Sequence, residues 1–209
     1  MSATSSSIPT EGSGSDLAGA ILRKSREAQQ TQEGFFSAEA DNIVACARAM
    51  AEVFDRGGRL WLMGNGGSAC DAQHMAVEFM HPIIDKRRPL PAASLATDSA
   101  LTSAIGNDED FARAFSRQLR TLGRTEDIAL GISTSGQSSN VNEGLTTARE
   151  IGMLTVGFSG RDGGRMVGLC DHSFVVSSFS IHRIQETHEV LLHVLWDSIH
   201  VIGGAEDVL

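Results

Sequence analysis

Short, mostly apolar runs alternate along the chain with segments whose apolar residues recur at helical spacing. Runs of this kind are typical of strands that are buried on both faces of a parallel sheet. They lie at residues 60–63, 92–96, 128–132, 154–158 and 173–176. The alternation predicts an α/β fold, a three-layer α/β/α sandwich around a central parallel sheet, plus N-terminal helices. Ligands of such folds bind at the carboxyl ends of the strands.

Two helices are predicted ahead of the first strand, at residues 16–32 and 35–54. The second helix carries an apolar stripe at helical spacing and is followed by two glycines, which commonly end a helix. Residues 1–14 are rich in Ser, Thr and Gly and predict a flexible N-terminal tail. We therefore expect a tail, 1–14, followed by a single domain, 15–209.

The later helices are predicted from the same periodicity. Asp98 is placed to cap the first of them, and Asn107 and Asp108 are expected in the turn that follows it. These helices lie at about residues 99–105, 111–122, 140–151, 166–169 and 184–202.

The charge balance narrows the range of partners. The chain has 209 residues and a formal net charge of −9, which argues against general binding to nucleic acid or to an anionic membrane surface. No apolar run has the length of a membrane span, and no signal segment is visible. The three cysteines have no metal-type or redox-type spacing and are interpreted as reduced thiols. A cytoplasmic protein is therefore expected.

A glycine-rich turn follows the first apolar run, where Asn65, Gly66, Gly67 and Ser68 lead into a helix. Glycines let backbone N–H groups approach an anion closely, and a helix N-terminus carries partial positive charge. Ser68 is predicted either to cap the helix or to donate its hydroxyl to a phosphate. The spacing fits neither a Walker phosphate loop nor a dinucleotide-binding glycine motif.

His74 and Glu78 follow on the same predicted helix. Their i, i+4 spacing puts both side chains on one helix face. Taken alone, this segment supports two interpretations equally: half of a metal or acid–base site beside a phosphate cradle, or a tight turn followed by a solvated His–Glu pair.

A second polar turn repeats this arrangement after the strand at 128–132. Ser133, Thr134, Ser135 and Ser138 offer four hydroxyl groups just before a helix. One serine is enough for a helix cap, so this density of hydroxyls favours an anion-binding cup.

Four segments, in order, resemble the phosphoheptose isomerase family of the sugar isomerase (SIS) superfamily, which has a flavodoxin-like fold. The segments are GNGGSACDAQHMAVEF at 64–79, AIGND at 104–108, STSGQS at 133–138 and RIQETHEVLLH at 183–193. The resemblance extends from about residue 35 to the last helix. It implies an aldose–ketose isomerase that converts sedoheptulose 7-phosphate to D-glycero-D-manno-heptose 7-phosphate for surface polysaccharide, and a homotetramer whose neighbouring subunits complete each active site.

The resemblance also implies roles for individual residues. It assigns acid–base roles to Glu78 and His193. It assigns the Zn²⁺ ligands to His74, Glu78, Gln185 and His193, and contact with the phosphate to the hydroxyls of the second turn. The implied substrate-binding residues together are Asn65, Gly66, Gly67, Ser68, Glu78, Asn107, Asp108, Ser133, Thr134, Ser135, Ser138 and Gln185.

The residues themselves are consistent with this chemistry, with two tensions. Moving a proton between two carbons through an enediol needs a base, an acid and a group that stabilises the oxyanion. A zinc-bound Glu78 is a poorer base than a free one. Gln185 and His193 lie eight residues apart, roughly 12 Å along a helix, whereas Glu189 and His193 form an easier i, i+4 pair.

Departures from the family pattern leave the substrate open. Pro82 occupies the region where relatives carry an arginine, and His182 replaces an acidic residue of some relatives. Arg87 and its neighbours Lys86 and Arg88 are candidates for the missing charge. The alternatives are an isomerase of another ketose phosphate, a sugar-phosphate-sensing domain, and a non-catalytic SIS protein that binds the replication initiator. The presence of both Glu78 and His193 argues against the last of these.

Overall fold

A five-stranded, all-parallel sheet forms the centre of the computed structural model, which describes residues 14–84 and 87–207. Its strand order, β2-β1-β3-β4-β5, is that of flavodoxin-like folds. The predicted fold class is confirmed. The predicted tail lies outside the described residues, except for Gly14, which begins a helix. The strands are β1 (Leu60–Gly64), β2 (Ala92–Ser94), β3 (Ile128–Ser133), β4 (Leu154–Gly160) and β5 (His172–Val176).

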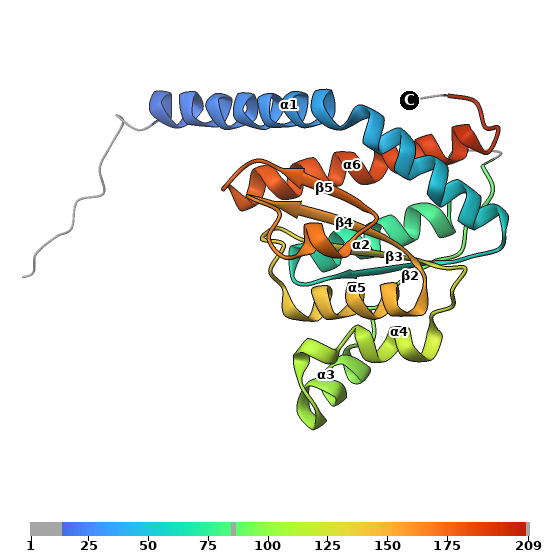
Figure 1. The fold of residues 1–209 in the computed structure, drawn as a ribbon. Helices are drawn as coiled ribbons and strands as arrows, with labels where there is room; N and C mark the ends of the chain where they lie inside the picture. Colours follow the sequence, from blue (N-terminus) through green and yellow to red (C-terminus); the bar gives the residue numbers. More distant parts are fainter. Residues whose placement is uncertain (1–13, 85–86, 208–209) are drawn as a thin grey trace, which may run out of the picture.

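Helices cover both faces of the sheet and complete the three layers (Figure 1). Alternate residues of β1 show how the faces divide: Leu60 and Leu62 join one hydrophobic core, and Trp61 and Met63 join the other. The first core includes residues of α1 (Gly14–Asp55), α2 (Gly67–Met80) and α6 (Ile181–Ile202). The second includes residues of α4 (Ser116–Leu122), α5 (Ser139–Ile151) and the short helix η2 (Met166–Leu169).

The N-terminal segment differs from the prediction, because α1 is one continuous helix of 42 residues and not two helices. Gly34 lies inside it with open space around its α-carbon, and a glycine in a helix costs only about 1 kcal/mol. The apolar stripe of α1 packs against α6, which offsets that cost. The first half of α1 extends beyond the sheet (Figure 1), and there Leu17 and Ile21 are 61% and 58% exposed.

The region after β2 also differs in detail. Asp98 caps α3 (Ser99–Asp108) as predicted, by accepting a hydrogen bond of 2.8 Å from the Leu101 N–H. The helix continues through Asn107 and Asp108, so the predicted turn at this pair is wrong. The helix predicted over 111–122 is divided into η1 (Phe111–Arg113) and α4. No helix in the described part of the chain is long and apolar enough to cross a membrane.

Candidate active site

The two polar turns meet at the carboxyl ends of β1 and β3. These strands are neighbours in the sheet, with Gly64 opposite Ile132, and the strand order reverses between them, where ligands of such folds bind. The amide side chains of Asn65 and Asn140 exchange two hydrogen bonds of 2.8 Å between the turns. Asn140 was not singled out from the sequence, because its partner is 75 residues away.

Backbone geometry explains the glycines of the first turn. A β-carbon on Gly64 would lie 2.3 Å from the Ser68 carbonyl oxygen, and Gly66 has a φ of +55°. Gly66 is the N-cap of α2, and Ser68 is buried inside the helix, so the predicted capping role of Ser68 is wrong. Asn65 and Gly66 line a cleft of about 530 Å³ that α3 also borders.

The second turn keeps its hydroxyl groups close together. The Ser133 and Ser138 oxygens are 2.8 Å apart, and the Ser138 side chain makes no capping bond to α5. Gly136 has a φ of +62°, and a β-carbon there would lie 2.0 Å from the Gly163 carbonyl oxygen. Since the glycines at 163 and 164 pack directly against it, the turn is held in place with its hydroxyls free of the helix cap.

Helices α2 and α6 lie side by side and run in the same direction, so their residues meet in order. Gln185 lies over Gly67, where an added β-carbon would be 2.1 Å from its amide nitrogen. About two turns further along, His193 meets His74 with 3.0 Å between their Nε2 atoms. Gln185 and His193 therefore reach two different positions on α2, at Gly67 and at His74.

A group of metal-type donors forms around the His74 ring. Its Nε2 atom lies 3.0 Å from His193 Nε2, 3.5 Å from Glu189 Oε1 and 3.8 Å from Glu78 Oε1. Donors around a tetrahedral zinc ion lie about 3.4 Å apart, given bonds of about 2.1 Å. The donor atoms of His74, Glu189 and His193 all lie within 4.8 Å of one another. This His–Glu–His group therefore fits a metal ion.

Asp71 adds a titrating group beside these donors. Burial and the negative charge of Glu189 raise the pKa of Asp71 to about 6, while the nearby His74 lowers it. Within the described residues, the buried Oδ2 atom of Asp71 has no hydrogen-bond partner. Its position one turn before His74 was the only signal in the sequence, and it was too weak to separate Asp71 from an ordinary helix-surface acid.

The predicted site residues fall into three sets. The glycine-rich turn and the hydroxyl turn lie together at the strand ends, and His74, Glu78 and His193 lie together between α2 and α6. Asn107 and Asp108 join neither set in this chain: both are exposed, and the Asn107 amide donates to the Asp108 carboxylate at 2.7 Å.

The candidate basic residues near Pro82 also differ from expectation. The guanidinium of Arg87 pairs with Asp197, and that of Arg88 pairs with Asp55. Lys86 lies outside the described residues.

The comparisons with known proteins agree with the fold. Residues 25–160 match the family model described as SIS domain. A phosphoheptose isomerase of Desulfovibrio desulfuricans is 47% identical over 175 residues, which are 84% of this chain and 83% of that protein. The chain belongs to the phosphoheptose isomerase family. Another member, from Aquifex aeolicus, is 41% identical over 83% of this chain and 91% of its own length.

Solved structures of the family have the same fold. Phosphoheptose isomerase from Neisseria gonorrhoeae aligns with a TM-score of 0.82 at 35% identity, covering 88% of this chain and 98% of its own. The enzyme from Francisella tularensis aligns with a TM-score of 0.84 at 31% identity, with the same coverage. Both alignments cover nearly the whole length of those phosphoheptose isomerases, so the fold of this chain is that of the family.

Proposed function

We propose that this member of the phosphoheptose isomerase family is an aldose–ketose isomerase that converts sedoheptulose 7-phosphate to D-glycero-D-manno-heptose 7-phosphate, a precursor of heptose in surface polysaccharide. The donor group around His74, with Glu78 beside it, is the observation that carries the proposal. An acid–base carboxylate next to metal-type donors suits enediol chemistry. A protein that only binds sugar phosphates would need neither the metal-type donors nor the adjacent carboxylate.

The substrate is proposed to bind with its phosphate at the hydroxyl turn. Ser133, Thr134, Ser135 and Ser138 donate hydrogen bonds to it, together with backbone N–H groups at the start of α5. The glycine-rich turn, Gln185 and the pair at 107–108 contact the sugar. Since that pair lies apart from the other residues in this chain, its contact requires a neighbouring subunit.

The metal is proposed to be Zn²⁺, held by His74, His193 and the Glu189 carboxylate. The ligand set expected from the family places Glu78 and Gln185 on the metal. In this chain the Glu189 oxygen is nearer to His74 than the Glu78 oxygen is, and Gln185 lies over Gly67. When bound, zinc supplies polarisation of the substrate carbonyl and stabilises the developing oxyanion.

With Glu189 as the metal-binding carboxylate, Glu78 remains available as the base. It removes the proton from C1 of the ketose and returns it to C2, so that an enediol forms and collapses to the aldose. His193 is the predicted partner that moves the hydroxyl proton between the two oxygens. A His193 ring that binds the metal through Nε2 would carry this proton on Nδ1, the other ring nitrogen.

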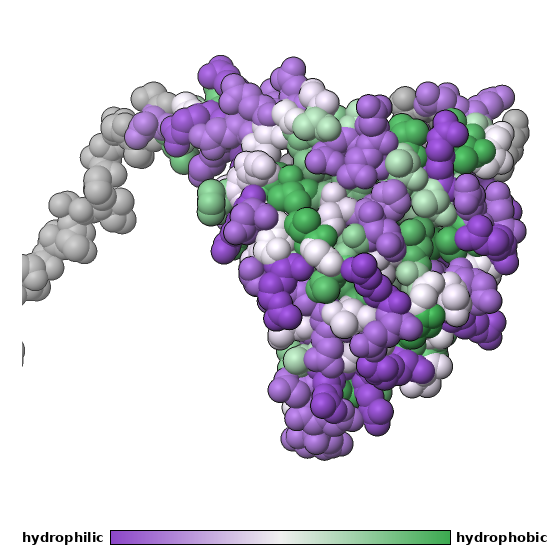
Figure 2. Space-filling model, viewed as in Figure 1, coloured by the Kyte–Doolittle hydropathy of each residue, from purple (hydrophilic) through white to green (hydrophobic). Residues whose placement is uncertain are grey.

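The protein is proposed to act as a homotetramer in the cytoplasm, without nucleic acid. Apolar side chains that the chain leaves exposed support an oligomer. They include Leu17 and Ile21 of α1, Phe179 just before α6, which is 85% exposed, and Ile181 at the start of α6, which is 48% exposed. Figure 2 shows hydrophobic surface gathered below the projecting part of α1.

The test is turnover by purified, zinc-loaded protein on a panel of ketose phosphates. Sedoheptulose 7-phosphate is expected to be converted with a kcat/KM at least tenfold above those for fructose 6-phosphate and ribulose 5-phosphate. A preference for another member of the panel would support the proposed reaction with a different substrate. The departures from the family pattern at Pro82 and His182 are the reason for testing several substrates. No turnover of any ketose phosphate would contradict the proposal and favour a binding protein.

A further inference from the structure

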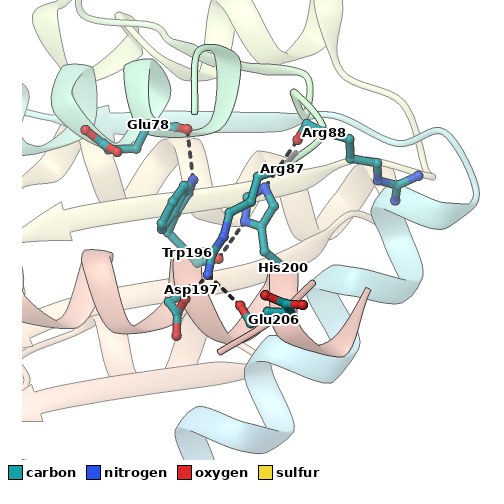
Figure 3. Close-up of polar contacts among 7 residues, drawn as sticks. All are labelled: Glu78, Arg87, Arg88, Trp196, Asp197, His200 and Glu206. Atoms are coloured by element: carbon teal, nitrogen blue, oxygen red, sulfur yellow. Dashed lines mark hydrogen bonds and ion pairs between the residues drawn. The ribbon is translucent and has the colours of Figure 1, made fainter. Parts of the chain in front are cut away.

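One side chain of α6 reaches the C-terminal end of α2, and both helices carry residues of the donor group. The indole N–H of Trp196, on α6, donates a hydrogen bond of 2.8 Å to the backbone carbonyl of Glu78, on α2 (Figure 3). Glu78 lies in the last turn of α2, where backbone carbonyls lack partners within the helix. The Trp196 bond therefore satisfies one of these carbonyls and ties the residue that carries the proposed base to α6.

The Trp196 ring is itself held on several sides. The guanidinium carbon of Arg87 lies 4.5 Å from the ring centroid, within the range of a cation–π contact. Arg87 also pairs with Asp197, and its side chain is only 2% exposed. The His200 ring centroid lies 4.8 Å from that of Trp196. Figure 3 shows the indole between Glu78 and the Arg87 guanidinium, with its N–H directed at the carbonyl.

The position of Trp196 matches the spacing of the site. Trp196 lies three residues after His193 on α6, and Glu78 lies four residues after His74 on α2. The Trp196 bond thus lies one turn beyond the contact between the two histidines, and both contacts hold this end of α2 in its alignment with α6. Sliding or opening of this end of α2 would move Glu78 away from the substrate while leaving the phosphate-binding hydroxyl turn intact.

We infer that Trp196, braced by Arg87, is a positioning residue that holds Glu78 at the distance and angle needed for proton transfer. This inference rests on the proposed function of Glu78 as the base. A misplacement of about 1 Å in an active site can cost on the order of 100-fold in rate. Loss of the bond therefore lowers kcat, while KM changes little because the phosphate is bound by β3 and α5.

The test compares Trp196→Phe with Trp61→Phe, which is a matched control. Trp61 is also buried and donates its indole N–H to Asp127 at 2.9 Å, but it lies on β1 and packs in the other core. At saturating zinc, Trp196→Phe is expected to lower kcat at least tenfold with KM within twofold of wild type. Trp61→Phe should keep kcat within twofold. Equal losses of kcat in the two variants, or a wild-type kcat in Trp196→Phe, would overturn the inference.

Two further measurements keep the outcome clear. If Trp196→Phe does not fold, Arg87→Lys takes its place in the kinetic test. This variant retains a charge for Asp197 but loses the planar stack on the indole, and it should lower kcat about threefold. A wild-type kcat for Arg87→Lys would then overturn the inference. Hydrogen exchange of the last turn of α2 should accelerate at least tenfold in Trp196→Phe and not in Trp61→Phe. This readout does not depend on activity, so an unchanged exchange rate counts against the brace even if the isomerase function fails.

Discussion

Replacing Glu189 by glutamine separates metal binding from proton transfer. The variant keeps the size of the side chain and removes the charge of the oxygen that lies 3.5 Å from His74 Nε2. Loss of residues that only orient a metal ligand typically costs 10–100-fold in metal affinity, so loss of a charged ligand should weaken zinc binding by about 100-fold or more. By the relation of 1.36 kcal/mol per tenfold change, that is about 3 kcal/mol.

The matched variant is Glu78→Gln, which changes the carboxylate that lies 3.8 Å from the same nitrogen. A general base contributes about 10²- to 10⁴-fold to the rate, so kcat should fall by that factor while zinc affinity changes less than tenfold. Zinc affinity is measured by competition with a chromophoric chelator, and kcat at saturating zinc.

Excess zinc should therefore restore the activity of Glu189→Gln and leave that of Glu78→Gln low. The opposite pattern, with zinc affinity lost in Glu78→Gln and kept in Glu189→Gln, would refute this division of roles. In that case Glu78 would be the metal-binding carboxylate, as the family resemblance implies.

Two further predictions concern the phosphate cup and the core. Replacing Ser133 and Ser135 by alanine should raise KM about tenfold or more with kcat nearly unchanged, because the phosphate does not react. The control is Ser139→Ala, at an adjacent, exposed position. An unchanged KM in the double variant would argue against the phosphate cup. Burial lowers the pKa of His188 to about 4 from an ordinary value of 6.5. Because the folded protein holds His188 neutral while the unfolded chain protonates it, the free energy of unfolding should fall by about 3 kcal/mol between pH 6.5 and 4. His188→Gln should reduce this loss in denaturant titrations, and identical pH dependence in both proteins would contradict the assignment.

The sheet was predictable because its strands are buried on both faces. Such strands need apolar residues at almost every position, and all six residues of β3 are buried. The length of α1 was not predictable in the same way. The helix-breaking tendency of Gly34 is local and visible in the sequence, whereas the packing of α1 on α6 is tertiary and outweighs it.

The candidate site was predictable only where its residues are close in sequence. His74 and Glu78 share a helix face, and the hydroxyl turn follows a recognisable strand, so both were found. The contributions of Asp71, Asn140 and Trp196 depend on the alignment of α2 with α6 and of β1 with β3. No local pattern specifies that alignment. Glu189 is intermediate, because its spacing from His193 was visible but its contact with His74 was not.

The most direct test of the central claim is the metal dependence of the isomerisation. The rate of aldose formation from sedoheptulose 7-phosphate is measured for the zinc-loaded protein, after removal of metal by a chelator, and after zinc is added back. We expect turnover that the chelator abolishes and that added zinc restores. Full turnover in the chelated protein, or none in the zinc-loaded protein, would contradict the account.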